Sequence, residues 1–145
     1  MTTDIRTKFE RIPLEVFNKG KTELIDELFA PEYTDRTPQP GMAPTRDGFK
    51  RWVTSLRTAF PDIRYTVEDV IDSGDRWVGR FTATGTMTGT FAGMSATGKQ
   101  ATWNEIHILR VSNGHVLEHW GVVQELSMLV QLGAIPAPDR VTAAA

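Results

Sequence analysis

The hydrophobic pattern of this chain changes its period once, at Ile63, and that change restricts the possible folds more than any other feature. Before it, apolar side chains recur every three or four residues within 5–17, 24–29 and 45–60, as they do on one face of a helix. After it, long segments alternate between apolar and polar residues, as in β-strands. The switch predicts an α+β domain whose helices gather on one side of a sheet.

The predicted strands follow one another across short turns and cover 63–71, 76–91, 101–111 and 115–124, with a short helix after them. Strands of this length must twist and curl. We therefore expect a curved antiparallel sheet whose concave side, closed by helices, encloses a pocket. The segment 31–45 contains four prolines and a glycine, and it is predicted to be a loop long enough to have a functional role.

Composition excludes several classes of protein. The 145 residues fit one domain, which we place at 1–135, followed by a flexible tail at 136–145. A net charge of −2, without any basic stripe, argues against a nucleic-acid partner. No apolar run reaches the roughly 18 residues of a membrane span, and the absence of cysteine removes thiolate nucleophiles and zinc–thiolate sites. These features predict a cytoplasmic protein with no nucleic-acid or membrane partner.

One face of the predicted strand 76–91 mixes large and very small side chains. Phe81, Met87 and Phe91 alternate there with alanine and glycine, while the other face carries threonine at every second position from 82 to 90. The mixed face is either ordinary packing or the floor of a cavity, because small residues leave volume that large ones border. The threonine face is flat and β-branched, and we expect a second copy of the chain to pack against it as a homodimer.

The turn "SNG" at 112–114 decides which residues of the last two strands share a face. With a two-residue turn, His107 lies opposite Trp120. With a three-residue loop, His107 lies opposite His119, and Glu105 lies opposite Gly121. The residue pattern of the turn slightly favours the shorter connection.

The chain resembles the SnoaL-like polyketide cyclases of the nuclear-transport-factor-two-like superfamily in four stretches, "LFAPEYTDRTPQPG", "AFPDIRYTVEDVIDSGDRWVGRFTATGTMTG", "GMSATGK" and "LEHWGVVQELSMLVQLG". The resemblance extends over nearly the whole chain. It implies a cone-like half-barrel packed by N-terminal helices, a deep apolar pocket, no cofactor and a homodimer. The superfamily also contains dehydratases, isomerases, epoxide hydrolases and non-catalytic members, so the fold does not define one activity.

The resemblance also implies which residues face the pocket. It implies that the side chains at positions 105, 107, 119 and 121 face one cavity, and this arrangement requires the three-residue loop. It also places Asp35 at the pocket mouth. His107 matches a pocket histidine of the characterised cyclases. The chain departs from those cyclases at four positions: Glu105 replaces a glutamine, Gly121 replaces the acid/base aspartate, Gln124 replaces a second aspartate, and Met87 replaces a histidine.

These residues predict general acid/base chemistry. A cyclase that closes a ring by aldol condensation must position its substrate and move protons as charge develops on oxygen. Burial in an apolar pocket would raise the pKa of Glu105 toward neutrality and suit it to that task. His107 and His119 would share hydrogen bonds with each other or with a ligand carbonyl. The alternative is that both histidines are packing residues and that Glu105 is an exposed charge under the other register.

We therefore predict a cofactor-independent cyclase that acts on a small hydrophobic or aromatic carbonyl compound. No metal is expected, because the histidines lack the spacing of metal ligands. The alternatives are a non-catalytic binding or accessory protein, or a dehydratase or epoxide hydrolase; an epoxide hydrolase needs paired carboxylates, and only Glu105 is a credible pocket acid. The predicted catalytic residues are Glu105, His107 and His119, and the predicted substrate-binding residues are Met87, Trp103, Gly121, Trp52 and Asp35, with Trp103 stacking on a planar substrate.

Overall fold

The structure is a computed structural model that describes residues 4–139. In chain order its elements are α1 Ile5–Arg11, the π-helix η1 Ile12–Phe17, α2 Leu24–Leu28, β1 Phe29–Asp35, α3 Arg46–Ala59, β2 Arg64–Asp72, β3 Arg76–Thr86, β4 Gln100–Ser112, β5 His115–Val123 and α4 Glu125–Gln131. This order confirms the predicted α+β class. None of the helices between residues 4 and 139 is long and apolar enough to cross a membrane.

The helices begin and end where the local sequence requires. Pro13 lies in the first turn of η1, where its missing N–H is tolerated, and it marks the end of the regular α-helix before it. α3 begins after Thr45, whose hydroxyl oxygen accepts a hydrogen bond from the backbone N–H of Gly48 as an N-terminal cap. The buried side of α3 carries Val53 and Leu56, which pack into the core.

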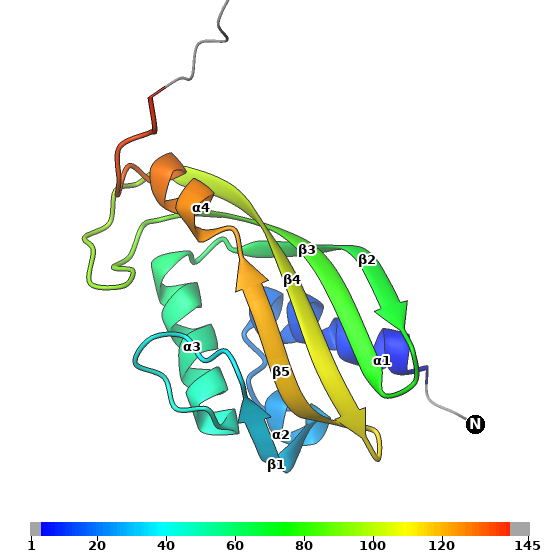
Figure 1. Cartoon of the computed structure of the whole chain (residues 1–145). Coiled ribbons are helices and arrows are strands. Elements are labelled where there is room, and N and C mark those ends of the chain that lie inside the picture. Colours follow the sequence, from blue (N-terminus) through cyan, green and yellow to red (C-terminus); the bar gives the residue numbers. More distant parts are fainter. Residues whose placement is uncertain (1–3, 140–145) are drawn as a thin grey trace, which may run out of the picture.

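The strands form one curved sheet with the order β1-β5-β4-β3-β2, and the N-terminal helices and α3 lie on one side of it (Figure 1). Neighbouring strands from β5 to β2 are antiparallel, but β1 runs parallel to β5. The sheet is therefore mixed and not wholly antiparallel as predicted. The strand missed by the sequence is β1, which lies partly in the predicted loop 31–45. Pro31 is tolerated there because β1 is an edge strand.

The alternation of β3 follows the predicted two faces. Trp77, Phe81 and Ala83 are buried on the concave side, and Thr82 and Thr84 lie half-buried on the outer side. The strand ends at Thr86, so the later threonines at 88 and 90 belong to the following loop. The predicted threonine face is therefore shorter than the sequence suggests.

The hairpin between β4 and β5 has a two-residue turn. Asn113 and Gly114 have φ values of 50° and 75°, and Ser112 pairs with His115. Two consecutive positive φ values are characteristic of the turn that best matches the twist of a hairpin. The three-residue loop selected from the family resemblance is wrong.

A β-bulge then changes the register beyond this turn. Leu117 is an extra residue in β5 between the pairs Val111–Val116 and Arg110–Glu118. As a result His107 pairs with Gly121, which neither predicted register contains. The bulge also turns His119 and Gly121 toward the concave face of the sheet, the side on which the resemblance placed them.

Candidate active site

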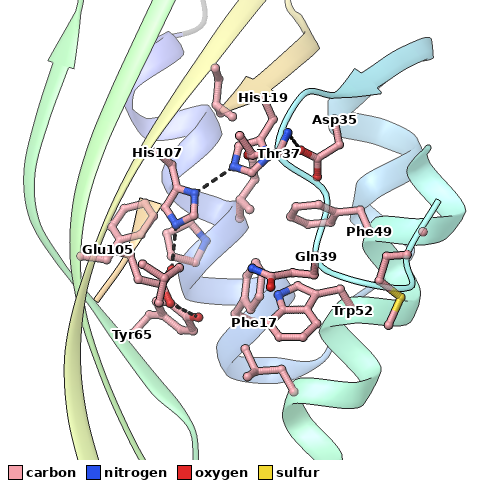
Figure 2. A pocket seen from close by; sticks show the side chains of 18 of the residues that line it. Phe17, Asp35, Thr37, Gln39, Phe49, Trp52, Tyr65, Glu105, His107 and His119 are labelled. Atoms are coloured by element: carbon pink, nitrogen blue, oxygen red, sulfur yellow. Dashed lines mark hydrogen bonds and ion pairs between the residues drawn. The ribbon is translucent and has the colours of Figure 1, made fainter. Parts of the chain in front are cut away.

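A largely apolar pocket lies between the concave face of the sheet and the helices that cover it (Figure 2). The loop 36–45 closes one side with Thr37, Gln39 and Met42. Within the described residues, no lysine or arginine lines the pocket. The aromatic lining residues are Phe17, Phe29, Phe49, Trp52, Tyr65, Trp77, Phe81, Phe91 and Trp103, and the acidic and imidazole lining residues are Asp35, Glu105, Glu125, His107 and His119.

Glu105 is a carboxylate in the buried wall of this pocket, with 7% of its surface exposed. Its Oε1 accepts hydrogen bonds from the hydroxyl of Tyr65 at 2.9 Å and from Nε1 of Trp103 at 2.8 Å. Its Oε2 lies 2.7 Å from Nε2 of His107. Trp103, Glu105 and His107 share the concave face because they occupy alternate positions of β4. Tyr65 reaches the same carboxylate from β2.

The pKa of Glu105 is shifted in the direction opposite to the predicted one. Burial by itself raises the pKa of this carboxyl group, but the hydrogen bond and charge of His107, with the hydrogen bonds of Trp103 and Tyr65, hold the pKa below its ordinary value. The expectation of a pKa near neutrality is therefore wrong, because sequence alternation places Trp103 and His107 on the same face as Glu105 but does not show that they and Tyr65 hydrogen-bond to its carboxylate. Burial and the charge of Glu105 raise the pKa of Tyr65, which therefore remains a donor.

Four side chains from three strands form one continuous hydrogen-bonded array, here called the four-residue network: Glu105 and His107 on β4, His119 on β5 and Asp35 on β1. Nδ1 of His107 and Nε2 of His119 share a hydrogen bond of 2.8 Å, and Nδ1 of His119 lies 2.9 Å from Oδ1 of Asp35 (Figure 2). The two imidazole rings are stacked, with centroids 5.1 Å apart. The parallel pairing of Asp35 with His119 closes this array.

Asp35 ends the four-residue network on the side of the pocket loop. Burial raises the pKa of its carboxyl group, but the hydrogen bond and charge of His119 and the backbone N–H of Thr37 hold the pKa below its ordinary value. Tyr33 lies beside the same carboxylate, and burial followed by the Asp35 charge raises the pKa of its phenol. The Tyr33 hydroxyl is buried and forms no hydrogen bond within residues 4–139.

Gly121 lies directly beside the hydrogen bond between the two histidines. A Cβ atom built on it would lie 2.5 Å from Nδ1 of His107 and 2.9 Å from Nε2 of His119. Real Cβ atoms do not approach other heavy atoms so closely, so a side chain here would separate the rings. Gly121 also donates its backbone N–H to Oγ1 of Thr37 at 2.8 Å. The glycine therefore makes room for the histidine pair and anchors the loop 36–45.

The structure brings most of the predicted site residues together, but two positions lie elsewhere. Trp52 and Trp103 line the pocket with the four-residue network. Met87 is fully buried and does not line the pocket; its Sδ accepts a hydrogen bond from Thr97. Gln124, where the resembled cyclases have a second aspartate, accepts hydrogen bonds from Asn104 through its Oε1 atom. Neither residue contacts the four-residue network.

The sequence reasoning missed one functional group, Tyr65, and gave an incomplete role to another, Asp35. Tyr65 was detectable, because it alternates with exposed neighbours on β2 and so had to face the core. Asp35 was predicted as a substrate-binding residue at the pocket mouth and not as part of a hydrogen-bonded array, and Glu105 was predicted to be the single pocket acid. The second prediction is wrong, because both carboxylates line the pocket. Their connection depends on β1, which the sequence pattern did not show.

The family model and the similar proteins of known function indicate the same family. The family model for SnoaL-like polyketide cyclases matches residues 8–132. Aklanonic acid methyl ester cyclase from Streptomyces sp. strain C5 is 28% identical over 130 residues, which is 87% of this chain and 81% of that protein.

Solved structures agree with the sequence comparison. TsrD from Streptomyces laurentii superposes with a TM-score of 0.82 at 25% identity, covering 90% of this chain and 96% of that chain. IdmH, described as a putative polyketide cyclase from Streptomyces antibioticus, superposes with a TM-score of 0.78 at 29% identity, covering 90% of this chain and 99% of that chain. Both proteins share the curved sheet and its covering helices.

Proposed function

Because this chain belongs to the SnoaL-like polyketide cyclase family, we propose that it is a cofactor-independent cyclase that closes a ring in a polyketide-like carbonyl compound. The reaction is an intramolecular aldol-type carbon–carbon bond formation. The observation that carries the proposal is the Glu105 carboxylate, which lies in the wall of an aromatic pocket and within 2.7 Å of His107. A carboxylate oriented by fixed donors is suited to accept and return a proton.

The proposed reaction balances without another reactant. A proton leaves an acidic carbon between carbonyl groups, that carbon bonds to the carbon of a ketone, and the ketone oxygen gains a proton. Glu105 accepts the carbon-bound proton and then returns it to the new alkoxide. Tyr65 and Trp103 occupy Oε1 of the carboxylate, so Oε2 is the oxygen with a remaining lone pair for the substrate. The product is an isomer of the substrate.

The lining of the pocket favours a neutral, planar substrate. Its acidic side chains are Asp35, Glu105 and Glu125, and among the described residues no cationic lysine or arginine compensates them. A free carboxylate on the substrate would lose its hydration without gaining a partner. An ester avoids that cost, and a similar protein is named for the methyl ester of aklanonic acid. The aromatic walls, including Trp52 and Phe49, offer faces on which fused rings can stack.

The test is the substitution Glu105→Gln, with Glu68→Gln as its matched control. Glutamine retains an acceptor for Tyr65 and Trp103 but removes the titratable proton. We expect kcat on a cyclisable aromatic diketone methyl ester to fall by roughly 10² to 10⁴, while the affinity for that ester remains. Glu68 is exposed and forms no hydrogen bond or ion pair within residues 4–139, so its variant should match the wild type. Unchanged turnover by Glu105→Gln would refute the assignment of Glu105.

A ligand-binding protein without turnover is the second candidate function. Position 121, where the resembled cyclases have their acid/base aspartate, is a glycine in this chain. If wild-type protein binds polycyclic aromatic esters tightly but converts none of them, this second function replaces the first. Titration of the protein with such an ester, together with analysis of the ester for conversion to product, decides between the two functions.

We also propose that the protein is a homodimer formed through the outer face of the sheet. Ile106, Ile108 and Val122 are 49%, 38% and 74% exposed on adjacent positions of β4 and β5. Contiguous exposed apolar side chains of this kind are typical of interaction surfaces. Val122→Lys should shift the mass measured by light scattering from dimer to monomer, whereas Glu68→Gln should not. A monomeric wild-type protein at micromolar concentration would refute the dimer.

A further inference from the structure

The hydrogen bonds of the four-residue network require one more proton than its two histidines carry when neutral. Three hydrogen bonds join Asp35, His119, His107 and Glu105, and each must contain one proton. A neutral histidine contributes one proton, so the pair supplies two. The third proton resides on one of the four groups. The third proton is assigned to the imidazole pair, with both carboxylates ionised, because each carboxylate also accepts hydrogen bonds from outside the pair: Glu105 from Tyr65 and Trp103, and Asp35 from the backbone N–H of Thr37.

The same contacts leave the histidines without a free nitrogen. His107 uses Nδ1 for His119 and Nε2 for Glu105, and His119 uses Nε2 for His107 and Nδ1 for Asp35. Phe81 stacks on the ring of His107, with centroids 5.5 Å apart, and Phe49 meets the ring of His119 edge-on. Neither imidazole can therefore bind a substrate atom while the network is intact.

We propose that Asp35, His119 and His107 are positioning residues that act on Glu105 through this shared proton, and that Gly121 is the residue that permits their contact. The inference rests on the proposed acid/base function of Glu105. It replaces a catalytic role for the histidines by a role in proton storage, and it assigns Asp35 as the far terminus of the network.

The proton movements balance at every step. When Glu105 accepts a proton from the substrate carbon, one proton moves from Nδ1 of His107 to Nε2 of His119, and another moves from Nδ1 of His119 to Oδ1 of Asp35. Every hydrogen bond is retained, and all four groups are then neutral. Without this shift a protonated imidazole would stay beside an uncharged Glu105 in a buried pocket, which is unfavourable. Return of the substrate proton to the alkoxide reverses both movements.

The surroundings of the network leave few other groups that could supply this proton. The described titratable groups that face it are Tyr65 from β2, Tyr33 from β1 and Glu125 at the start of α4. Burial raises the pKa of both tyrosines, so they keep their protons. Arg36 and Arg110 each form an ion pair with Glu118, and none of the three residues lines the pocket.

The first test uses ¹⁵N NMR of the free protein and therefore needs no substrate. His115→Gln serves as the background in which only the two network histidines remain. We expect a nitrogen–nitrogen coupling across the hydrogen bond between His107 and His119, and we expect Gly121→Ala to abolish it. Gly121 lies outside the glycines with positive φ, so alanine fits the backbone, and circular dichroism checks that the variant folds. A coupling that survives in Gly121→Ala, or is absent from the parent, overturns the proposal.

The second test is kinetic and uses Asp35→Asn, with exposed Asp69→Asn as its control. Asparagine can accept the hydrogen bond of His119 but cannot store a proton. We expect kcat to fall roughly tenfold to a hundredfold, less than the full loss of an acid/base group, with KM nearly constant. Because a negative charge is removed, the network should also lose its third proton at lower pH, which shifts one limb of the rate profile.

The two proposals fail in different ways. If Asp35→Asn keeps the wild-type rate and pH profile while Glu105→Gln is inactive, the shared proton is refuted and the cyclase proposal remains. If Glu105→Gln is fully active, the acid/base function fails, whatever the NMR coupling shows. A fall in the rate of Asp35→Asn without a shift of the pH profile indicates a merely structural role and also overturns the inference.

Discussion

The substitution Glu105→Leu should destabilise the protein through the donors it leaves behind. Tyr65 and Trp103 are 3% and 1% exposed, and both donate to Oε1 of Glu105. Each unpaired buried donor costs about 1–3 kcal/mol, or about 2–6 kcal/mol for the pair. The greater apolar burial of leucine offsets about 1–2 kcal/mol of this. We expect a net loss of about 0–5 kcal/mol in the free energy of unfolding, with a midpoint of about 2.5 kcal/mol, whereas Glu105→Gln, which keeps the acceptor, should lose less.

The decisive measurement is a double-mutant cycle with Tyr65→Phe, followed by urea unfolding at constant pH and tryptophan fluorescence. In the wild-type background, removal of the Tyr65 hydroxyl breaks a hydrogen bond to a carboxylate and should destabilise the fold. In the Glu105→Leu background the same substitution removes an unpaired hydroxyl and should stabilise it. The reasoning is refuted if Tyr65→Phe destabilises both backgrounds to the same extent.

Three further predictions concern pH, the pocket loop and the edge of the sheet. The pKa values of Asp35 and Glu105 are lowered in the folded state, so their stabilisation is complete above the ordinary carboxyl pKa of about 4 and is lost as pH falls through the folded values. The decrease in the free energy of unfolding between neutral and acidic pH, followed by circular dichroism, should therefore be smaller for Glu105→Gln than for wild type. Gly48→Ala would push a Cβ into the carbonyl oxygen of Ala43, so it should cost about 1–3 kcal/mol and expose the loop 36–45 to limited proteolysis. Asn18 pairs with both backbone groups of Tyr65, so Asn18→Ala should accelerate hydrogen exchange at the Tyr65 amide, and unchanged exchange would contradict this role.

The sequence predicts the face of β4 well because regular alternation determines it. Trp103, Glu105 and His107 stand at every second position, so a strand assignment is sufficient to place them together. The direction of the Glu105 pKa shift could not be predicted in the same way. It depends on Tyr65, which comes from another strand, and on a ring orientation of His107 that the sequence pattern does not show.

The remaining errors have local causes. The segment 29–35 contains a proline and precedes a proline-rich loop, so its pattern resembles a loop although it pairs as an edge strand. The contact between Asp35 and His119 joins residues 84 positions apart, and parallel pairing leaves no turn signal between them. The bulge at Leu117 inserts a residue without any glycine or proline to mark it, so simple alternation along β5 assigns the wrong faces.

That bulge also gives β5 a place at which the chain could be shortened by one residue without harm to the site. Val116 already pairs with Val111 and Glu118 with Arg110, on either side of Leu117. Deletion of the Leu117 codon would therefore leave a regular ladder with the same partners, whereas deletion of the His119 or Gly121 codon would remove a residue of the site itself. A codon-by-codon deletion scan of β5 should find that loss of Leu117 is tolerated and that loss of His119 or Gly121 is not, and homologous sequences aligned by structure should place a gap at the bulge.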